Sequence, residues 1–397
     1  MNAYDAVIIG GGACGLMCAI QAGFLGKKTL ILEKNDQVGA KILISGGGRC
    51  NYTNLYASAD NFISQNPHFI KSAFSQWTVE DTITFFETYG ITGQEKTLGQ
   101  LFPTTNKAKD VVAVFEHLCR DLDQEIRCNA EVQSVKPIEE GFEVIFEQNG
   151  QKKSLKTPKV VLASGGLPIA KMGATDFALR TARSFGLKIT ETAPALVPLT
   201  ITGKDAEWYA QLSGNSVFCR VYNDVISFQE NILFTHWGLS GPAILQISSY
   251  WRPGQTFTID LLPDRSILAL IEEERAKGGK QLLVNFLANI YTKKLAEAMG
   301  KFLPLDKNLA SLNKTDLETL EQLIHHFRVK PAGDKGYDKA EVMRGGVSTD
   351  ELSSKTLEAK QVPGLYFGGE AVDITGWLGG YNFQWAWASG YVIAQNL

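Results

Sequence analysis

The chain has 397 residues, of which 44% are hydrophobic and 20% are charged, and its formal net charge is −3. This balance is typical of a globular protein and excludes a strongly basic one, so we expect neither a nucleic acid nor an anionic membrane surface as a partner. A chain of this length exceeds what one hydrophobic core serves, and two or three domains are expected.

The sequence indicates a reduced, cytoplasmic protein. The first predicted strand begins by Tyr4, which leaves no room for a cleavable apolar segment. No apolar run approaches the length that a membrane span needs, so we expect no membrane partner. The six cysteines contain no C-x-x-C pair, and no cluster of side chains has metal-ligand spacing. We expect no metal site.

A glycine-rich turn follows the first predicted strand, Tyr4–Ile9. Three glycines with the spacing G-x-G-x-x-G lie between that strand and a helix predicted over Ala13–Leu25, and they are Gly10, Gly12 and Gly15. The first allows a tight turn, the second lets a pyrophosphate approach the backbone, and the third lets helix and strand pack closely. The arrangement predicts a Rossmann-like α/β domain that binds a dinucleotide.

An acidic residue ends the second predicted strand, Thr29–Leu32. Glu33 lies 18 residues after Gly15, where a carboxylate can accept hydrogen bonds from a ribose diol. The same carboxylate would repel a 2′-phosphate. The sequence therefore favours a nucleotide without that phosphate.

A second glycine-rich segment follows, and its sequence from Lys41 to Asn54 is KILISGGGRCNYTN. Three successive glycines beside Ser45, Arg49 and Asn51 predict a loop rich in free N–H groups, which can surround an anion or a ring edge. Such a loop near the first turn can hold the other end of the same dinucleotide. Arg49 either contacts the ring at that end of the cofactor or an anionic substrate, or clamps the pyrophosphate.

These residues resemble the signature of a bacterial family of BaiN-like or aminoacetone-oxidase-like NAD(P)/FAD-dependent oxidoreductases. In that family the dinucleotide fingerprint is followed by K-[IL]-x-x-S-G-G-G-R-C-N-x-T-N, which this chain carries without a break. The resemblance implies FAD and an FAD-binding domain of the glutathione-reductase type. It extends over nearly the whole chain.

The middle of the chain changes from helical to β periodicity. Alternating apolar residues from Ile126 to Val161, with Asn149-Gly150 between two runs, predict a β-meander with a type I′ hairpin. In the resembling class a meander leads to an A-T-G turn near the cofactor, and Ala163-Ser164-Gly165 is similar to it. Thr175 opens a later helix, either near the flavin or as an N-cap.

The segment from Ala193 to Leu262 is rich in predicted strands, and Arg265–Leu323 is predicted to be helical. Within the strands, Phe234–Leu245 resembles the family's T-H-x-G-x-S-G-P motif. His236 in that motif either exchanges a proton beside the flavin or anchors the turn.

The C-terminal segment is predicted to rejoin the first domain. Gly364–Phe367 reads as a last buried strand, and the following Gly368-Gly369-Glu370 resembles the family's closing G-E pair. A helix over Tyr381–Ala394 starts beside Gly379-Gly380, and its N-terminus can stabilise negative charge on the reduced flavin.

The expected architecture is an FAD-binding domain with an inserted β-rich domain and a small helical subdomain. The FAD-binding domain comprises residues 1–192 and 340–397, the barrel-like β-rich domain 193–264 and 326–339, and the helical subdomain 265–325. The candidate catalytic residues are Arg49, His236 and Tyr381. The candidate cofactor-binding residues are Gly10, Gly12, Ala13, Cys14, Gly15, Glu33, Lys34, Lys41, Ser45, Gly46, Gly47, Gly48, Arg49, Cys50, Asn51, Val132, Ala163, Ser164, Gly165, Gly166, Thr175, Gly369, Glu370, Gly380, Tyr381 and Asn382.

The function expected from these features is hydride transfer between FAD and a small organic substrate. No second strand-GxGxxG-helix unit follows Glu33, so NAD(P)H is expected only as a transient electron donor, with oxygen as another electron partner. One alternative is a flavin-containing partner of RNA or another macromolecule, against which the acidic balance and the lack of a basic stripe weigh. A second alternative is an NAD-binding protein without redox function.

Overall fold

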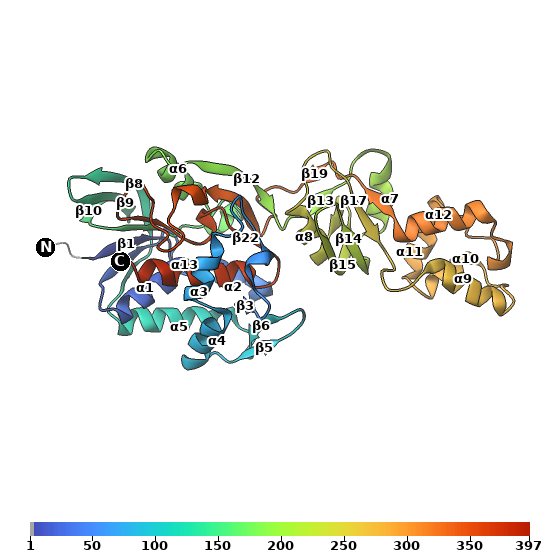
Figure 1. The fold of residues 1–397 in the computed structure, drawn as a ribbon, viewed down its shortest axis with the longest axis horizontal. Coiled ribbons are helices and arrows are strands. Elements are labelled where there is room, and N and C mark those ends of the chain that lie inside the picture. The colour runs from blue at the N-terminus through green and yellow to red at the C-terminus, as the bar shows by residue number, and fades with distance from the viewer. Residues whose placement is uncertain (1–3) are drawn as a thin grey trace. The chain divides into compact units, whose positions relative to one another are not determined.

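The computed structural model describes residues 4–397, which divide into two compact units (Figure 1). The first unit comprises the chain up to Ala193 together with Val342–Leu397, and the second comprises Pro194–Glu341. The chain leaves and re-enters the first unit through two strands that pair with each other, β12 (Ile189–Ala195) and β20 (Val342–Val347).

The first unit is built on a five-stranded sheet with the order β21-β11-β1-β2-β7. Its strands are β1 (Ala6–Ile9), β2 (Thr29–Leu32), β7 (Glu125–Arg127), β11 (Val160–Leu162) and β21 (Leu365–Phe367). All neighbouring strands run parallel, so their carboxyl ends meet at one edge. Four of these strands, β1, β2, β11 and β21, are wholly buried, as their continuous apolar runs require. The predicted Rossmann-type fold is confirmed.

Helices and smaller sheets surround this sheet. The helices of the first unit are α1 (Ala13–Phe24), α2 (Ala40–Gly48), α3 (Ile70–Gln76), α4 (Val79–Thr88), α5 (Ala108–Asp121), α6 (Phe177–Ser184) and α13 (Tyr381–Ala394). The remaining strands are β3 (Thr53–Asn54), β4 (Phe62–Ile63), β5 (Gly93–Glu95), β6 (Gln100–Pro103), β8 (Ala130–Ile138), β9 (Gly141–Gln148), β10 (Gln151–Thr157) and β22 (Thr375–Gly376). α13, from the end of the chain, packs against α1.

The predicted β-meander is confirmed. Strands β8, β9 and β10 form one antiparallel sheet, in which Gln148 pairs with Gln151. The two residues between them, Asn149 and Gly150, have φ values of 54° and 73°. Positive φ at both positions is what a type I′ turn requires.

The segment expected as a loop from Lys41 differs, because it begins as a helix. α2 starts at Ala40, and its Ile42 side chain is buried in the core. The helix is interrupted where Ser45 becomes extended, and Gly46 and Gly47 then adopt left-handed φ values of 55° and 71°. Because the buried Ile42 side chain holds the start of this segment against the core, that start is helical. The loop begins only at Ser45.

The second unit contains a seven-stranded sheet with the order β18-β17-β14-β15-β16-β13-β19. Its strands are β13 (Leu199–Thr200), β14 (Ser216–Tyr222), β15 (Ser227–Thr235), β16 (Gly238–Ser240), β17 (Phe257–Asp260), β18 (Phe327–Val329) and β19 (Gly333–Asp334). Its helices are α7 (Ala206–Gln211), α8 (Pro242–Ser248), α9 (Ile267–Ala276), α10 (Leu283–Ala288), α11 (Lys293–Ala298) and α12 (Lys314–His325).

Two polar contacts tie the helices between β17 and β18 to the rest of the second unit. The Trp208 indole N–H donates to the Ala298 carbonyl at 2.7 Å, and His325 Nδ1 lies 2.8 Å from Asp260 Oδ1. The separation of residues 265–325 as a subdomain stays a prediction.

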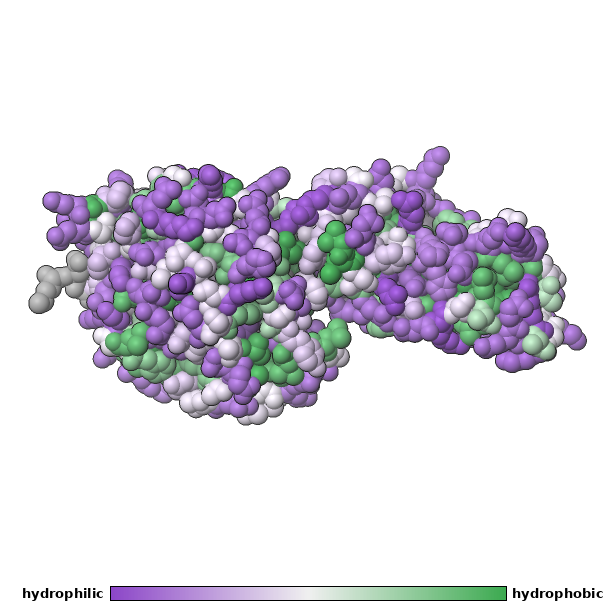
Figure 2. Space-filling view, in the orientation of Figure 1, coloured by the Kyte–Doolittle hydropathy of each residue, from purple (hydrophilic) through white to green (hydrophobic). Residues whose placement is uncertain are grey.

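Polar residues cover most of the surface in view, and apolar residues form separate patches on it (Figure 2). Across residues 4–397, no helix has the length and apolar character to cross a membrane.

The core of the first unit yields a test of stability. Trp387 is fully buried, stacks on Phe115 with ring centroids 5.2 Å apart, and donates its indole N–H to the Tyr52 carbonyl at 2.8 Å. Trp387→Ala should lower the free energy of unfolding of this unit by about 3–5 kcal/mol. Trp387→Phe should cost about 1–3 kcal/mol, because the Tyr52 carbonyl loses its donor.

Denaturant unfolding followed by circular dichroism measures both effects. Phe24→Leu, at a position that is 46% exposed, serves as the control and should change stability by no more than about 0.5 kcal/mol. A Trp387→Phe protein as stable as the wild type would show that the indole hydrogen bond contributes nothing.

Candidate functional site

The first glycine turn lies at the carboxyl edge of the parallel sheet. A Cβ added to Gly10 would lie 2.5 Å from the Ala163 carbonyl oxygen, and one added to Gly15 would lie 2.0 Å from the Gly10 carbonyl oxygen. Packing against neighbouring backbone therefore requires both glycines. A Cβ at Gly12 would meet no described atom within 4 Å. Gly12 thus borders open space that the fold itself does not need.

This open space lies at the N-terminus of α1. Gly12 is the N-cap, and no side chain accepts a hydrogen bond there. The following residues, Ala13 and Cys14, begin the helix and carry N–H groups without intrahelical partners. These donors and the helix dipole together favour an anion such as a pyrophosphate.

Glu33 is held against the glycine turn. Its side chain is 8% exposed, with Oε2 accepting the Gly11 N–H at 2.7 Å and Oε1 accepting the Asn35 N–H at 2.8 Å. These two bonds fix the plane of the carboxylate. Each oxygen keeps further acceptor capacity, so the group can also accept from a ribose hydroxyl.

The meander approaches the same edge of the sheet. The Ala130 N–H donates to the Glu33 carbonyl at 2.9 Å, and the Lys34 ammonium lies 3.9 Å from Glu131 Oε1. Val132 follows in the same strand and is buried. The backbone of β8 thereby comes next to the end of β2.

The second glycine loop, Ser45–Asn51, turns back on itself. The Ser45 carbonyl accepts the N–H groups of Arg49 and Cys50, and Cys50 adopts a left-handed φ of 60°. The Asn51 side-chain oxygen is buried and has no hydrogen-bond partner among residues 4–397. An orphaned buried acceptor is rare in proteins, and here it borders the loop that the sequence assigned to a cofactor.

The start of α13 meets this loop. A Cβ at Gly380 would lie 2.4 Å from the Thr53 carbonyl oxygen, and the Asn54 amide donates to the Gly379 carbonyl at 2.9 Å. Gly380 caps the helix with a φ of 97° and without a side-chain hydrogen bond to the N-terminus. The Asn382 side chain bonds the backbone N–H and carbonyl of Gly376, which holds the first turn in place.

An ion pair links α2, just before the second loop, to the C-terminal segment. The Lys41 ammonium lies 2.7 Å from Glu370 Oε2, and Glu370 Oε1 accepts the Met343 N–H at 2.8 Å. Gly166 packs against the same carboxylate, since a Cβ there would lie 3.1 Å from its Cδ. The neighbouring Ser164 hydroxyl is buried without a partner among the described residues.

Gly369 completes this group of contacts. Its N–H donates to the Ser389 hydroxyl at 2.9 Å, and a Cβ added to it would lie 3.2 Å from the Cβ of Cys14. Burial raises the pKa of Cys14 to about 12 and that of Cys18 well above its ordinary value. Both thiols are protonated at neutral pH, so they pack as small apolar groups and are not nucleophiles.

The structure distributes the three catalytic candidates over both units. Arg49 is exposed, donates its Nε–H to the Gly46 carbonyl at 2.7 Å, and lies 5.2 Å from the centre of the Phe102 ring. Tyr381 is buried at the start of α13 and packs edge-on against Phe62. His236 belongs to the second unit, where it is exposed in the turn between β15 and β16.

Thr175 precedes α6. Its hydroxyl accepts the Phe177 N–H at 3.3 Å, which is a turn-forming contact at a helix start. Whether it also touches a flavin stays a prediction.

Sequence reasoning missed one element of this site. β6 contributes Phe102, beneath Arg49, and Gln100, whose side chain lies 2.9 Å from where a Cβ of Gly379 would be. A short strand with no motif gives no functional signal. Only its position beside two glycine-rich segments reveals it.

Five segments that are far apart in the sequence therefore converge at one edge of the sheet. They supply two uncapped helix N-termini, a carboxylate at the end of β2, and two orphaned oxygens, Asn51 Oδ1 and Ser164 Oγ. The open space beside Gly12 lies at the first of these helix N-termini, that of α1. Phosphates suit the α1 N-terminus, a ribose suits Glu33, and an electron-rich ring suits the α13 N-terminus. The donor set fits FAD.

This fold and site define an FAD-dependent oxidoreductase with a Rossmann-type FAD-binding domain. The sequence profile of the HI0933-like protein Rossmann domain matches residues 4–396. The chain therefore belongs to the HI0933-like family.

Several proteins of known name are similar to this chain over its full length. A ribosomal RNA dihydrouridine synthase of Escherichia coli (strain K12) is 44% identical over 400 residues, which cover 100% of this chain and 98% of the relative. The protein of the same name from Haemophilus influenzae is 40% identical and covers 100% and 99%. A 3-dehydro-bile acid delta(4,6)-reductase of Clostridium scindens is 28% identical over 98% and 97%.

Among solved structures, the 3-ketosteroid-delta4-(5alpha)-dehydrogenase of Rhodococcus jostii RHA1 superposes with a TM-score of 0.53. It covers 99% of this chain and 98% of that one at 12% sequence identity. At this identity the likeness is one of fold.

Two glycines of the first turn, Gly12 and Gly15, allow an effect on cofactor binding to be separated from an effect on folding. Gly12→Ala should leave the thermal stability of the apoprotein unchanged, because its Cβ meets no protein atom, but should weaken FAD binding by placing a methyl group at the pyrophosphate. Gly15→Ala should destabilise the fold itself by at least about 1–3 kcal/mol, since its Cβ overlaps the Gly10 carbonyl.

Calorimetric melting of the apoproteins and titration with FAD measure these effects. A Gly12→Ala protein that binds FAD with wild-type affinity would show that the open space beside Gly12 is not the pyrophosphate site.

Proposed function

We propose that this enzyme reduces uridine in ribosomal RNA to dihydrouridine, with FAD as the hydride carrier. The observation that carries the proposal is the sequence identity of 44% and 40%, over the full chain, to two relatives that are named ribosomal RNA dihydrouridine synthase. The relative that is named for a bile acid has only 28% identity. The proposal departs from the sequence-based expectation of a small-molecule substrate and no nucleic acid.

The reaction adds two hydrogens across the C5–C6 bond of uracil. That bond is conjugated with the C4 carbonyl, so C6 accepts a hydride and C5 then takes a proton. FAD bound at this site would supply that hydride, and NAD(P)H is proposed as the donor of the single hydride, with its two electrons, that reduces the flavin. Negative charge develops at O4 after hydride addition, and a fixed donor near that oxygen lowers the barrier.

Residues of this chain suit these tasks. The N-terminus of α13, uncapped after Gly380, favours negative charge on the flavin. Arg49 offers a guanidinium group, which is oriented by its hydrogen bond to the Gly46 carbonyl and by its contact with the Phe102 ring. We propose that Arg49 stabilises the reduced flavin or the developing charge on the substrate. His236 and Tyr381 are the proposed proton donors.

A second candidate is reduction of a carbon–carbon double bond in a small, steroid-like acid. The name of the Clostridium scindens relative, a bile acid reductase, supports it. The resemblance of the Lys41–Asn54 segment to the BaiN-like family supports it as well. The chemistry is the same, because both reactions saturate a double bond by adding a hydride and a proton. The two candidates differ in the substrate that must reach the flavin.

One experiment separates the candidates. The purified yellow protein is incubated without oxygen with NADH or NADPH and with ribosomal RNA transcribed in vitro, which contains no dihydrouridine. Mass spectrometry of the digested nucleosides should detect dihydrouridine. Its absence, together with turnover of an unsaturated 3-keto bile acid, would contradict the RNA proposal and favour the small molecule.

Arg49→Ala should slow reduction of the flavin by NAD(P)H, or reduction of the substrate, while FAD remains bound. Loss of a charge-assisted contact worth about 1.5–3 kcal/mol corresponds to a rate lower by about 10- to 150-fold. Arg49→Lys should recover part of the rate, because an ammonium lacks the fork geometry of guanidinium. Stopped-flow absorbance and FAD occupancy are measured on the same preparation.

Arg183→Ala is the matched control, because Arg183 is an exposed arginine at the end of α6. If excess FAD restores the full rate to Arg49→Ala, the residue serves cofactor binding alone.

A further inference from the structure

The sheet of the second unit has one buried face and one solvent face. Along β14 the side chains of Val217, Cys219 and Val221 are buried, and those between them point the other way. Residues that pair across neighbouring strands share a face. The pairing of the strands therefore continues the solvent face from β14 onto β15, β17 and β18.

Aromatic and basic side chains alternate on the solvent face of β14. Phe218 is 50% exposed, Arg220 follows two positions later, and Tyr222 follows two positions after that. The two ring-bearing positions are about 13 Å apart along the strand. What marks Phe218 is its neighbours on the same face, which carry hydrogen-bonding and cationic groups.

Neighbouring strands extend this face. Tyr222 is in register with Thr258 of β17, which is in register with Arg328 of β18. Arg328 thus lies two strands away, about 10 Å across the sheet, and is exposed. On the other side of β14, Asn231 and Gln229 of β15 lie opposite Phe218 and Arg220.

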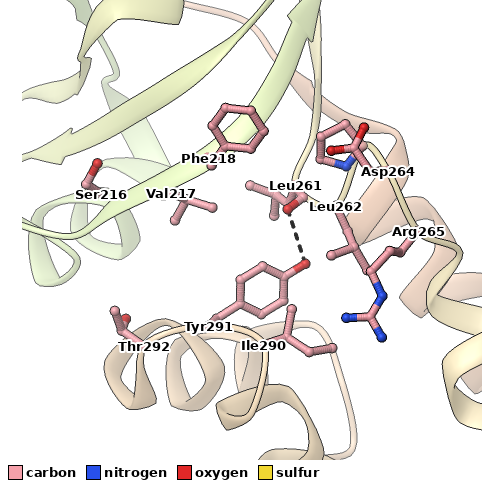
Figure 3. Close-up of a pocket in the computed structure, with 11 residues that line it drawn as sticks. Ser216, Val217, Phe218, Leu261, Leu262, Asp264, Arg265, Ile290, Tyr291 and Thr292 are labelled. Carbon is pink, nitrogen blue, oxygen red and sulfur yellow. Dashed lines mark hydrogen bonds between the residues drawn. The ribbon is translucent and has the colours of Figure 1, made fainter. Parts of the chain in front are cut away.

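A cavity of about 360 Å³ opens beside Phe218 (Figure 3). Figure 3 shows the rings of Phe218 and Tyr291 on opposite sides of it, with Leu261 between them. The Tyr291 hydroxyl donates to the Leu261 carbonyl at 3.5 Å, which holds its ring at the wall. Arg265 stands at the rim and is exposed. The volume is in the range of ligand sites and admits a planar base.

Both arginine and carboxylate side chains lie around this face. Arg220, Arg265 and Arg328 supply three guanidinium groups. Two carboxylates lie in the same region, and both have partners: Asp260 is 2.8 Å from His325 Nδ1, and Asp264 accepts from the Gln229 amide at 3.1 Å. Arg220 also donates to the Gln229 side-chain oxygen at 3.3 Å, and Arg328 donates to the Thr256 hydroxyl at 3.4 Å. Because a guanidinium has five N–H donors, each arginine keeps donors for a phosphate.

We propose that this solvent face binds an unpaired stretch of the ribosomal RNA substrate, with one base stacked on Phe218 beside the cavity. We call it the stacking face and define it by Phe218, Arg220, Tyr222, Arg265 and Arg328. The inference rests on the proposed function and adds where the RNA is held. Unpaired bases stack on aromatic rings and arginine planes, while guanidinium groups bind the phosphates.

The test is binding of a fluorescein-labelled, single-stranded oligouridylate of about 12 nucleotides, which an OB-fold-sized site accommodates. Fluorescence anisotropy of the FAD-loaded protein is measured at several salt concentrations. Phe218→Ala should weaken binding about 5- to 150-fold with an unchanged salt slope, because it removes one stacked base. Arg220→Gln should reduce the slope of log K against log salt by about 0.7, because it removes one phosphate contact.

Matched controls come from the first unit. Phe24→Ala removes a ring that is 46% exposed, and Arg183→Gln removes an exposed guanidinium; neither should change binding. Phe218→Trp should retain affinity, because an indole stacks at least as well. FAD content and melting temperature verify that every variant is folded.

The readouts separate this inference from the proposed function. In the ribosomal RNA assay, Phe218→Ala should raise KM for RNA and leave kcat unchanged. If dihydrouridine forms but the oligonucleotide does not bind, or binds Phe218→Ala as tightly as wild type, the stacking face is refuted and the proposed function stands. If the wild type neither binds RNA nor forms dihydrouridine, both are refuted.

Discussion

The close contact between the first glycine turn and the neighbouring backbone is the constraint on which the FAD site depends. Gly10 touches the end of β11, and Gly15 touches the carbonyl of Gly10, so the turn leaves no space for a side chain at either position. This contact sets the start of α1 at the edge of the sheet. α13 then packs on α1, where a Cβ at Gly390 would lie 2.5 Å from the Cys14 carbonyl. Both helix N-termini that can stabilise anionic charge are positioned by contacts between backbones.

The site also shows how a binding surface differs from a packed core. Around Gly10 and Gly15 the structure is filled, whereas Gly12 borders open space and two oxygens, of Asn51 and Ser164, lie buried without partners in the described chain. Leaving such oxygens unpaired costs free energy, and a bound cofactor with hydroxyl and ring N–H groups offsets that cost. The ion pair of Lys41 with Glu370 joins α2 to the turn that follows β21.

In the proposed function, the chemistry of the flavin and the choice of substrate belong to different parts of the chain. The first unit supplies the residues that suit FAD, and the second supplies a sheet whose solvent face presents rings and guanidinium groups. Saturation of a double bond is a reaction that a nucleobase and a steroid-like acid can both undergo, as the names of the relatives illustrate. The surface that holds the rest of the substrate then decides between them. A net charge of −3 is compatible with RNA binding when a few arginines gather on one face.

The sequence by itself determined the FAD-binding fold and most of its candidate site. The G-x-G-x-x-G turn, Glu33 and the Gly46–Gly48 loop are local signals, because glycine tolerates tight turns and close backbone approach that other residues do not. Tertiary structure decided what no local pattern contains. The role of β6 beside Arg49, and the helical start of the Lys41 segment, depend on packing against distant residues such as Phe102 and the core around Ile42. The stacking face was invisible in the sequence because Arg220 and Arg328 belong to separate strands that only strand pairing brings together.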